Sequence, residues 1–363
     1  MSVLIDRYLP DLRHFEVNMS HEENGKIYGE VCGGAVHSCM VSVSCITFNH
    51  GRYLRQALNS FLSQKTDFPF EILIHDDAST DDTIDIIREY AEKYPDIIRP
   101  MYEEKNQYSQ GISNISGVFN FPRARGKYIA MCEGDDYWTD DLKLQKQVDI
   151  MEAHPEYSLC THAAAIVSED GAFRSESSIR PFEKSRELTR EEFISKKTNV
   201  PTASMLFRTE YAKSLPKWYY DCPVGDIPLQ LFMAENGGIY YIDEEMSAYR
   251  MGGSGSWGKT MDDASKRAAF IDRWEKHYAA MKTLYEAFDL ETNGKWHEAV
   301  NTALMRQRFH IDLKEGNAKV VLKKENRQFV DELPKAEAKL QYLKAKAPFV
   351  YELMRKAYGL IKH

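Results

Sequence analysis

The chain of 363 residues has no long apolar run, no paired cysteines and no surplus of positive charge. No apolar run reaches the roughly 18 residues that span a membrane, so no transmembrane helix is expected. Charged residues interrupt the first apolar segment, so we expect no secretory signal there. The net charge of −8 argues against nucleic acid as a partner, because nucleic acids bind to a basic face.

The six cysteines are scattered, without a C-x-x-C pair. Cys45, Cys132 and Cys160 lie within apolar stretches, where cysteine behaves as a small buried apolar residue. This pattern favours a reducing compartment over a disulfide framework. We therefore expect a cytoplasmic protein, and its 43% hydrophobic and 28% charged residues are typical of a globular chain.

From residue 41 onward, short apolar runs alternate with amphipathic segments. The apolar runs have the length of buried strands and cover residues 41–47, 70–75, 96–102 and 128–132. The segments with apolar residues three and four positions apart, as in a helix, are residues 53–64 and 83–94. This alternation predicts an α/β fold, in which helices cover a mostly parallel central sheet.

The elements expected later in the chain are more widely spaced. Thr139 is predicted to cap a helix over residues 140–154, as Ser79 is predicted to cap the helix over residues 83–94. The later strand candidates are residues 157–167, 202–207 and 239–242. From about residue 259, helical composition takes over. The predicted organisation is an N-terminal extension of unknown role (1–40), an α/β domain (41–258) and a C-terminal helical region (259–363).

Acidic residues cluster at the ends of two predicted strands. Asp76 and Asp77 follow the second strand, and Glu133, Asp135 and Asp136 follow the fourth. In open α/β sheets, ligands bind beyond the carboxyl ends of the strands, so both clusters are expected to line one crevice.

The first cluster, Asp76 and Asp77, has two interpretations. Aspartates are common in turns and at helix starts, because their side chains accept hydrogen bonds from free backbone N–H groups. Alternatively, Asp76 accepts hydrogen bonds from a nucleobase or a ribose. The sequence leaves both open.

The second cluster, Glu133 to Asp136, brings together carboxylates that raise each other's pKa values unless a cation lies among them. A hard divalent cation, bound by one or two carboxylates and by substrate phosphates, would compensate this charge. Gly134 would let the backbone approach a ligand closely. The cluster therefore predicts a metal–phosphate site, with a solvated loop as the alternative.

A third candidate lies further along the chain, where Asp226 precedes an apolar helical segment. Asp226 could cap this helix, or it could be a general base that deprotonates an acceptor hydroxyl. Arg250 precedes a glycine-rich stretch, which is typical of a loop that closes over a substrate. Its guanidinium could bind phosphate or lie on the surface.

Residues 41–64, 71–83 and 126–138 together resemble the inverting GT-A glycosyltransferases, the family that includes cellulose, chitin and hyaluronan synthases. They are most similar to the soluble bacterial members that build capsule, O-antigen and other surface polysaccharides. The resemblance covers about residues 41–258. It implies a GT-A fold, a nucleotide-diphospho-sugar donor, most often a UDP-sugar, and an Mg²⁺ or Mn²⁺ ion. The acceptor would be a glycan or a lipid-linked molecule.

The resemblance gives five residues a role in donor binding. Thr47 and Asn49 would lie in the first donor loop. Asp76, with Asp77 beside it, would contact the base. Glu133, which stands where the family has the first aspartate of its Asp-x-Asp motif, would contact the ribose side.

The remaining roles concern the metal and the reaction. Asp135 would bind the metal that bridges the diphosphate, and Asp136 would lie near the donor or acceptor sugar. Asp226 would be the catalytic base. Arg250 would contact the donor phosphates, in a motif that resembles the Tyr-Arg-x-His of the family.

The sequence departs from the family pattern in three places. Glu133 replaces an aspartate, and Gly252 stands where a histidine that contacts metal or diphosphate is common. The arginine usual upstream of the fourth strand is missing, so Arg123 or Arg125 would have to replace it. The Gln-x-x-Arg-Trp motif and the membrane helices of the processive synthases are absent, which implies transfer of one sugar per encounter.

Other functions stay open at this point. Glu133 and Gly252 would suit a catalytically degenerate protein that binds sugar nucleotides. A sugar-phosphate nucleotidyltransferase would normally have a glycine-rich basic phosphate loop near its N-terminus, which the sequence lacks. A phosphoacceptor receiver domain would not explain the second acidic cluster.

The C-terminal tail is rich in basic residues. Between residues 335 and 363 they are Lys335, Lys339, Lys344, Lys346, Arg355, Lys356 and Lys362, against Glu337 and Glu352. Its last segment has apolar residues at helical spacing, and a basic amphipathic helix can lie on an anionic membrane. The sequence predicts either peripheral contact with the inner face of the cell membrane, or packing on the catalytic domain or a partner subunit. The oligomeric state is left open.

Overall fold

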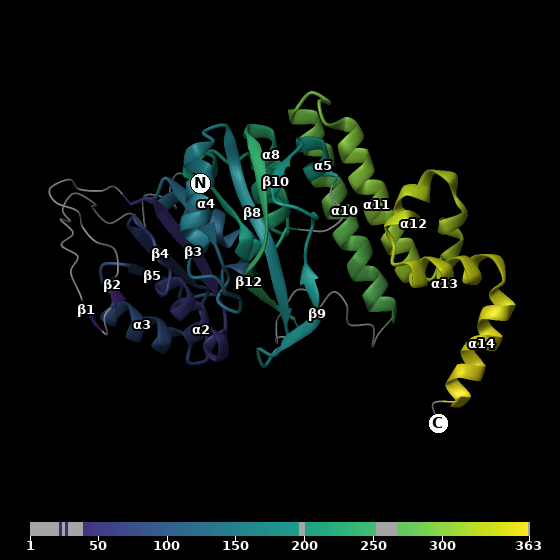
Figure 1. Ribbon diagram of the computed structural model, residues 1–363, viewed down its shortest axis with the longest axis horizontal. Coiled ribbons are helices and arrows are strands. Elements are labelled where there is room, and N and C mark those ends of the chain that lie inside the picture. The colour runs from purple at the N-terminus through teal and green to yellow at the C-terminus, as the bar shows by residue number, and fades with distance from the viewer. Residues whose placement is uncertain (1–21, 24–25, 28–38, 196–199, 252–266, 362–363) are drawn as a thin grey trace.

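The computed structural model describes residues 22–23, 26–27, 39–195, 200–251 and 267–361. It shows an α/β domain with helices beside it, and α14 (Pro348–Ile361) forms the far end of the molecule (Figure 1). The predicted α/β class is confirmed. Of the first 38 residues, only a short antiparallel pair is described, β1 (Glu22–Glu23) and β2 (Lys26–Ile27).

One half of the main sheet is parallel, as predicted. Its strands pair in the order β6-β3-β4-β5 and are β3 (Val41–Thr47), β4 (Phe70–Asp76), β5 (Ile98–Tyr102) and β6 (Tyr128–Met131). Helix α2 (Gly51–Leu62) follows β3 and α3 (Thr83–Lys93) follows β4, each with its apolar stripe buried. The carboxyl ends of β3, β4 and β6 therefore meet at one edge, next to both acidic clusters.

The other half of the sheet is mixed, so the prediction of a mostly parallel sheet holds only in part. The three-residue strand β11 (Leu206–Arg208) lies between β6 and β8 (Tyr157–Val167) and is antiparallel to both. The long β12 (Gly238–Arg250) is parallel to β8. The first residues of the strand predicted over 202–207 form the 3₁₀ helix η4 (Thr202–Ser204) instead.

Three strands escaped prediction. β7 (Tyr137–Trp138) and β10 (Arg186–Leu188) pair with β12, and β9 (Phe173–Ile179) pairs with β8. β7 and β10 are too short to give a period, and β9 is largely polar. Their place is set by neighbouring strands rather than by their own sequence.

Both predicted helix caps are wrong. Helix α4 (Lys143–Ala153) begins after Leu142, because Thr139 still belongs to the extended segment of β7 and its hydroxyl donates to the carbonyl of Glu245 at 2.9 Å. The hydroxyl of Ser79 donates to Asp76 Oδ1 at 2.5 Å, and Ser79 lies four residues before the first residue of α3. In both places a hydroxyl has a better partner than the helix end.

Helix α8 (Asp226–Asn236) runs along the sheet towards the amino end of β8. The hydroxyl of Ser158, near the start of β8, donates to the carbonyl of Met233 in the last turn of α8 at 2.6 Å. Strand β11 is antiparallel to both β6 and β8, so β8 runs parallel to β6. The last turn of α8 lies near the amino end of β8, and the first turn of α8 therefore lies toward the carboxyl ends of these strands. Asp226 is the first residue of that turn.

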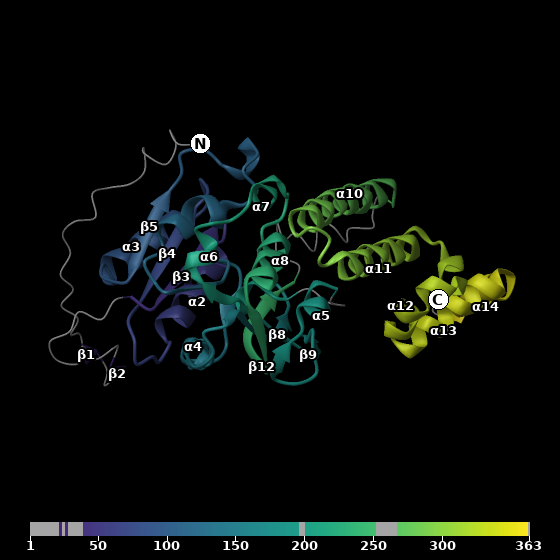
Figure 2. The ribbon, with the colours of Figure 1, turned by 90° about the horizontal axis from the view of Figure 1, so that it is seen from above.

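The C-terminal helices are present as predicted. The pair α10 (Arg267–Glu291) and α11 (His297–Glu315) packs on the α/β domain, since Tyr285, Phe288 and Trp296 share a core with Trp218. Seen from above, this pair lies between the domain and the last helices (Figure 2). Those are α12 (Arg327–Glu332), α13 (Lys335–Lys346) and α14. The predicted boundary near residue 259 falls outside the described residues.

No helix among the described residues is long and apolar enough to cross a membrane. The described cysteines are free, as predicted, and they are Cys39, Cys45, Cys132, Cys160 and Cys222. Cys32 lies outside the described residues.

Candidate active site

The two loops that follow β3 and β4 are joined by side-chain hydrogen bonds. Asp76 is fully buried, and its Oδ1 accepts from the hydroxyl of Thr47 at 3.0 Å. Its Oδ2 accepts from the backbone N–H of Ser79 at 2.9 Å. Asp76 therefore holds the turn after β4, and its predicted contact with a base remains a prediction.

Backbone strain marks the same two loops. Asn49 and Ala78 both have positive φ values, 55° and 62°, a conformation that costs energy outside glycine and persists only where the surroundings enforce it. Asn49 Oδ1 accepts from the N–H of Thr80 at 2.8 Å, and its own N–H donates to Ser79 Oγ at 2.8 Å. The loop after β3 is thus fixed to the loop after β4.

Asp77 caps a different segment. Its Oδ1 accepts from the N–H of Gln107 at 2.6 Å and its Oδ2 from the N–H of Tyr108 at 3.1 Å. Asp77 is buried, and it anchors the start of the long connection between β5 and β6. Its structural role is therefore clear from the hydrogen bonds, whereas a donor contact is untested.

The second acidic cluster lies directly after β6, and two of its carboxyl groups have strongly raised pKa values. Burial, then the charges of Asp135 and Asp226, raise the pKa of Glu133 to about 8. Burial and the charge of Asp135 raise the pKa of Asp136 well above its usual range, although Asp136 Oδ1 accepts from the N–H of Arg250 at 2.8 Å. Carboxylates that repel each other in this way favour a bound cation.

Gly134 is needed for packing against the first donor loop. A Cβ atom at this position would lie 2.6 Å from Thr47 Cγ2 and 3.0 Å from His50 Nδ1. The predicted close approach is therefore an approach to protein side chains. It brings the acidic loop and the loop after β3 into contact.

His50 was missed by the sequence analysis. Its Nε2 lies 4.0 Å from Asp135 Oδ2, and both side chains are only partly exposed. Within the described chain, Asp135 Oδ1 and His50 Nδ1 are buried without a hydrogen-bond partner. Only the pairing of β3 with β6 brings these residues together, so no local sequence signal could have identified His50.

Arg250 holds the acidic loop in place by hydrogen bonds, and its predicted contact with the donor phosphates remains a prediction. Its guanidinium donates to the backbone oxygens of Asp135 at 2.9 Å and of Glu169 at 3.0 Å, and to Gln56 Oε1 at 2.8 Å. It also lies over the ring of Tyr53, 4.6 Å from the ring centroid. Arg250 thereby fixes the acidic loop to α2 and to the turn after β8. The glycine-rich stretch that follows, with Gly252, lies outside the described residues.

Neither Arg123 nor Arg125 supplies the arginine missing from the family pattern. Arg123 is partly buried and donates to the carbonyls of Ile74 at 2.8 Å and Arg99 at 2.9 Å. Arg125 Nη2 lies 2.6 Å from Glu71 Oε2, at the amino end of β4 and opposite the acidic clusters. Both arginines stabilise the domain, and this expectation was wrong.

Asp226 begins helix α8 after Gly225 and lies close enough to the second cluster to raise the pKa of Glu133. The segment before α8 is held by Asn114, whose amide donates to the carbonyl of Cys222 at 3.0 Å. One turn further along α8, Gln230 is fully buried, and neither atom of its amide has a hydrogen-bond partner in the described structure. The structure thus places Asp226 within electrostatic reach of Glu133, and the N-terminal end of the helix favours negative charge at Asp226.

The described residues contain no group of three or more His, Cys, Asp and Glu side chains that could hold a metal by themselves. Asp135 with an unpartnered oxygen, and His50 beside it, nevertheless fit a cation that takes its remaining ligands from a diphosphate and water. Such a cation needs only one or two ligands from the protein.

Comparisons with known proteins identify the family and the fold. Residues 42–214 match the family model described as glycosyl transferase family 2. The uncharacterized protein Rv1520 of Mycobacterium tuberculosis is 36% identical over 266 residues, 72% of this chain and 71% of that protein. The putative teichuronic acid biosynthesis glycosyltransferase TuaG of Bacillus subtilis is 36% identical over 112 residues, 31% of this chain and 42% of that protein.

Among solved structures, S. aureus TarS 1–349 in complex with UDP is similar in fold. The TM-score is 0.53 at 18% identity, over 85% of this chain and 81% of that chain. This likeness supports the predicted GT-A fold.

Proposed function

Because the chain belongs to glycosyl transferase family 2, we propose that it transfers a sugar from a nucleotide-diphospho-sugar to a hydroxyl group of a glycan or lipid-linked acceptor in bacterial surface polysaccharide synthesis. A UDP-sugar is the proposed donor, which is in keeping with the UDP bound to the structurally similar TarS. The observation that carries the proposal is the convergence of Glu133, Asp135 and Asp226 at the carboxyl edge of β6.

Asp135, with His50 beside it, would hold an Mg²⁺ or Mn²⁺ ion together with the donor diphosphate. The ion, when bound, would compensate the charge that develops on the departing diphosphate. Arg250 holds Asp135 in place through a hydrogen bond to its backbone oxygen. Gly134 lets the acidic loop approach the loop after β3 closely. Thr47, Asn49, Asp76 and Asp77 keep the donor loops in shape.

We propose Asp226 as the general base. Its carboxylate takes the proton of the acceptor hydroxyl while that oxygen forms a bond to C1 of the sugar. The bond between C1 and the diphosphate oxygen breaks, the nucleoside diphosphate leaves, and the configuration at C1 is inverted. One sugar is transferred per encounter.

The first experiment measures binding and slow hydrolysis of UDP-, GDP- and dTDP-sugars with and without Mn²⁺, on the wild type and on Asp135→Ala. We expect Mn²⁺-dependent binding of one donor, and loss of that dependence in Asp135→Ala, because no other described side chain supplies an unpartnered carboxylate oxygen beside His50. Asp85→Ala, which changes a carboxylate on the exposed face of α3, is the matched control.

The outcomes separate an enzyme from a protein that only binds sugar nucleotides. Binding without hydrolysis or transfer under any metal condition would favour the degenerate binding protein. Absence of binding to every donor would overturn the proposal.

We also propose that the reaction takes place at the inner face of the cell membrane. A lipid-linked acceptor would bring the enzyme to the inner face of the cell membrane as a peripheral protein. The C-terminal helices are the part of the chain predicted to make that contact.

A further inference from the structure

The last helix, α14, projects from the body of the molecule. Helix α13 packs on a small core of Phe309, Val320 and Phe329, and Pro348 then starts α14 in a new direction. Figures 1 and 2 both show α14 beyond α13, at the end away from the sheet. The sequence predicted that the tail either contacts a membrane or packs on the catalytic domain or a partner subunit. In this structure α14 does not pack on the catalytic domain.

The exposed side of α14 is apolar. The exposed fractions are 75% for Phe349, 46% for Val350, 52% for Leu353 and 58% for Met354. Positions 349 and 353, and positions 350 and 354, are one turn apart, so the four side chains form one stripe along the helix. Soluble monomers rarely expose a contiguous apolar patch of this kind without a partner for it.

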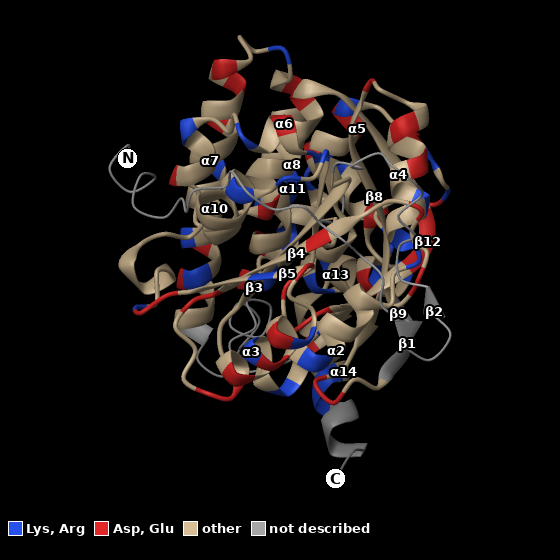
Figure 3. Cartoon of the chain, turned by 90° about the vertical axis from the view of Figure 1, so that its left-hand side faces the viewer, with Lys and Arg blue, Asp and Glu red and all other residues tan. Residues whose placement is uncertain are grey.

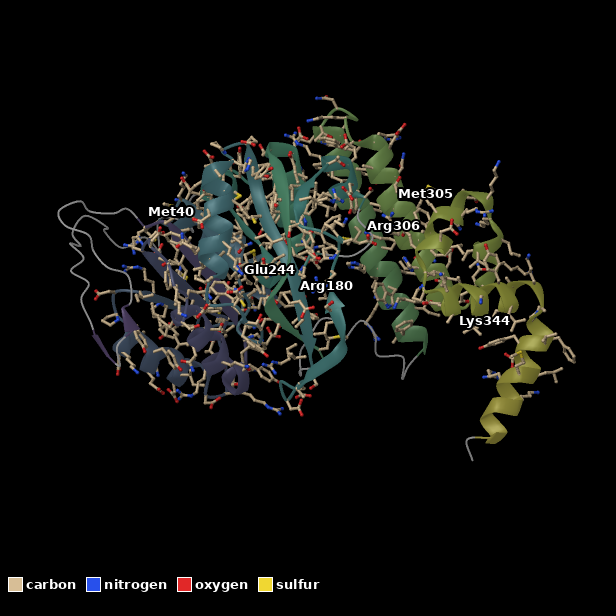
Figure 4. All side chains as sticks on the ribbon, in the orientation of Figure 1. Met40, Arg180, Glu244, Met305, Arg306 and Lys344 are labelled. Atoms are coloured by element: carbon tan, nitrogen blue, oxygen red, sulfur yellow. The ribbon has the colours of Figure 1, made fainter. Side chains whose placement is uncertain are left out.

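Basic residues lie on the same two helices. Lys356 lies beside the stripe, whereas Arg355 lies on the opposite side of α14 and pairs with Glu352 at 2.9 Å. Arg355 and Lys356 are exposed on α14, as are Lys339 and Lys346 on α13. Figure 3 shows a blue segment, the colour of Lys and Arg, on α14 next to the grey C-terminal end. At the joint between the helices, Lys344 lies with its Nζ 5.0 Å from the centroid of the Tyr351 ring (Figure 4). Lys362 lies outside the described residues.

We propose that α14 docks on an anionic lipid bilayer, with the stripe Phe349, Val350, Leu353 and Met354 in the interface and the basic residues of α13 and α14 at the headgroups. Charge decides between the two possible occupants of the stripe. Helices α13 and α14 carry six basic residues against two acidic ones, Glu337 and Glu352, so two copies packed through the stripe would repel each other, whereas an anionic surface complements the excess positive charge. Docking of α14 on the bilayer does not depend on the proposed function. Only its role, which is to hold the enzyme near a lipid-linked acceptor, rests on that function.

The test is sedimentation of the full chain with lipid vesicles, in the absence of donor and acceptor. Vesicles of phosphatidylcholine alone are compared with vesicles that contain about one third phosphatidylglycerol. We expect binding to the anionic vesicles, a decrease with added salt because of screening, and at least a ~10-fold weaker partition for Phe349→Ser/Leu353→Ser. Leu290→Ser is the matched control, because Leu290 is 80% exposed on α10, and it is expected to bind like the wild type.

Three outcomes would overturn the proposal. They are absence of binding to anionic vesicles, equal binding by the wild type and Phe349→Ser/Leu353→Ser, and self-association of the wild type that the double variant loses without any vesicle binding. Since both substituted side chains are exposed, loss of folding is not expected, and circular dichroism verifies this. Because no substrate is used, a failed donor assay together with vesicle binding would contradict only the proposed function.

Discussion

The two acidic clusters look alike in the sequence but differ in how their charge is compensated. In the first cluster, the carboxylates of Asp76 and Asp77 accept hydrogen bonds from backbone N–H groups and from hydroxyl groups. In the second cluster, Asp135 keeps an oxygen without a partner, and burial together with mutual repulsion raises the pKa values of Glu133 and Asp136.

This difference separates scaffold from chemistry. A carboxylate that receives two or three hydrogen bonds from the protein stabilises a turn. Carboxylates that are crowded and incompletely paired reduce stability, and such groups are typical of functional sites. The first cluster therefore shapes the donor loops, and the second is where a cation and the reacting groups are expected.

The largest effect is expected from Asp226→Asn, beside the second cluster. An amide cannot accept the proton of the acceptor hydroxyl, so turnover should fall at least ~100-fold while donor affinity stays nearly unchanged. Initial rates with the donor found by the binding assay, alongside calorimetric titration of that donor, measure the two quantities. Asp221→Asn is the control, because Asp221 is an exposed carboxylate on helix α7 (Lys217–Asp221) that pairs with Lys217. Normal turnover in Asp226→Asn would leave Asp226 as a helix-terminal residue only.

A second prediction concerns a buried cation behind the second cluster. Lys143 is fully buried, with its Nζ 2.7 Å from Gln147 Oε1 and 4.3 Å from the centroid of the Trp138 ring. Burial lowers the pKa of Lys143 to about 7 from 10.5. Lys143→Met removes the free-energy cost of burying the amine. After subtraction of the lost hydrogen bond to Gln147, the free energy of unfolding should rise by on the order of 2 kcal/mol near neutral pH.

The difference in stability between the wild type and Lys143→Met should depend on pH. Below pH about 7 the amine is protonated in both states, and its cost to stability is complete. As the pH rises from about 7 to 10.5, only the unfolded state still binds the proton, so the wild type gains stability relative to Lys143→Met. Urea denaturation across this range measures the difference, with the exposed Lys217→Met as control. A difference that does not shrink with pH would mean that Lys143 has a normal pKa in the folded protein.

Much of the fold near the site was predictable because the signals are local. The strands β3, β4 and β6 are short and largely apolar, and α2 and α3 have clear helical periodicity. The placement of both acidic clusters at one edge followed from this order. The helix starts were not predictable. Thr139 and Ser79 are residue types that cap helices. Thr139 instead contacts Glu245, which only the tertiary structure brings near, and Ser79 contacts Asp76 in the local turn after β4.

The site was predictable only as far as motifs reach. Asp135 and Asp226 were chosen from their motifs, and the structure brings Asp226 close to the second cluster. His50 and the clamp formed by Arg250 depend on strand pairing and on contacts between residues more than a hundred positions apart. Such contacts leave no trace in the local pattern, so the sequence could not show that Arg250 also fixes the acidic loop.

The third prediction tests the first cluster. Asp77→Ala leaves the N–H groups of Gln107 and Tyr108 without their partner, so the free energy of unfolding should fall by about 2 kcal/mol. Urea denaturation measures this, with Asp85→Ala on the exposed face of α3 as control. If the stability were unchanged and donor affinity fell instead, Asp77 would be a donor ligand rather than part of the scaffold.

The smallest effect is expected from His50→Gln, which keeps a polar side chain next to Asp135. If the imidazole contributes to the cation site, Mn²⁺ affinity in the presence of UDP should fall about 5-fold, equivalent to about 1 kcal/mol, with the unfolding free energy nearly constant. Titration of Mn²⁺ followed by electron paramagnetic resonance measures this without any turnover. His154→Gln is the control, because His154 is exposed and contacts Glu156 rather than the site. Equal Mn²⁺ affinity in both variants would leave Asp135 as the protein ligand, with His50 acting only as packing against Gly134.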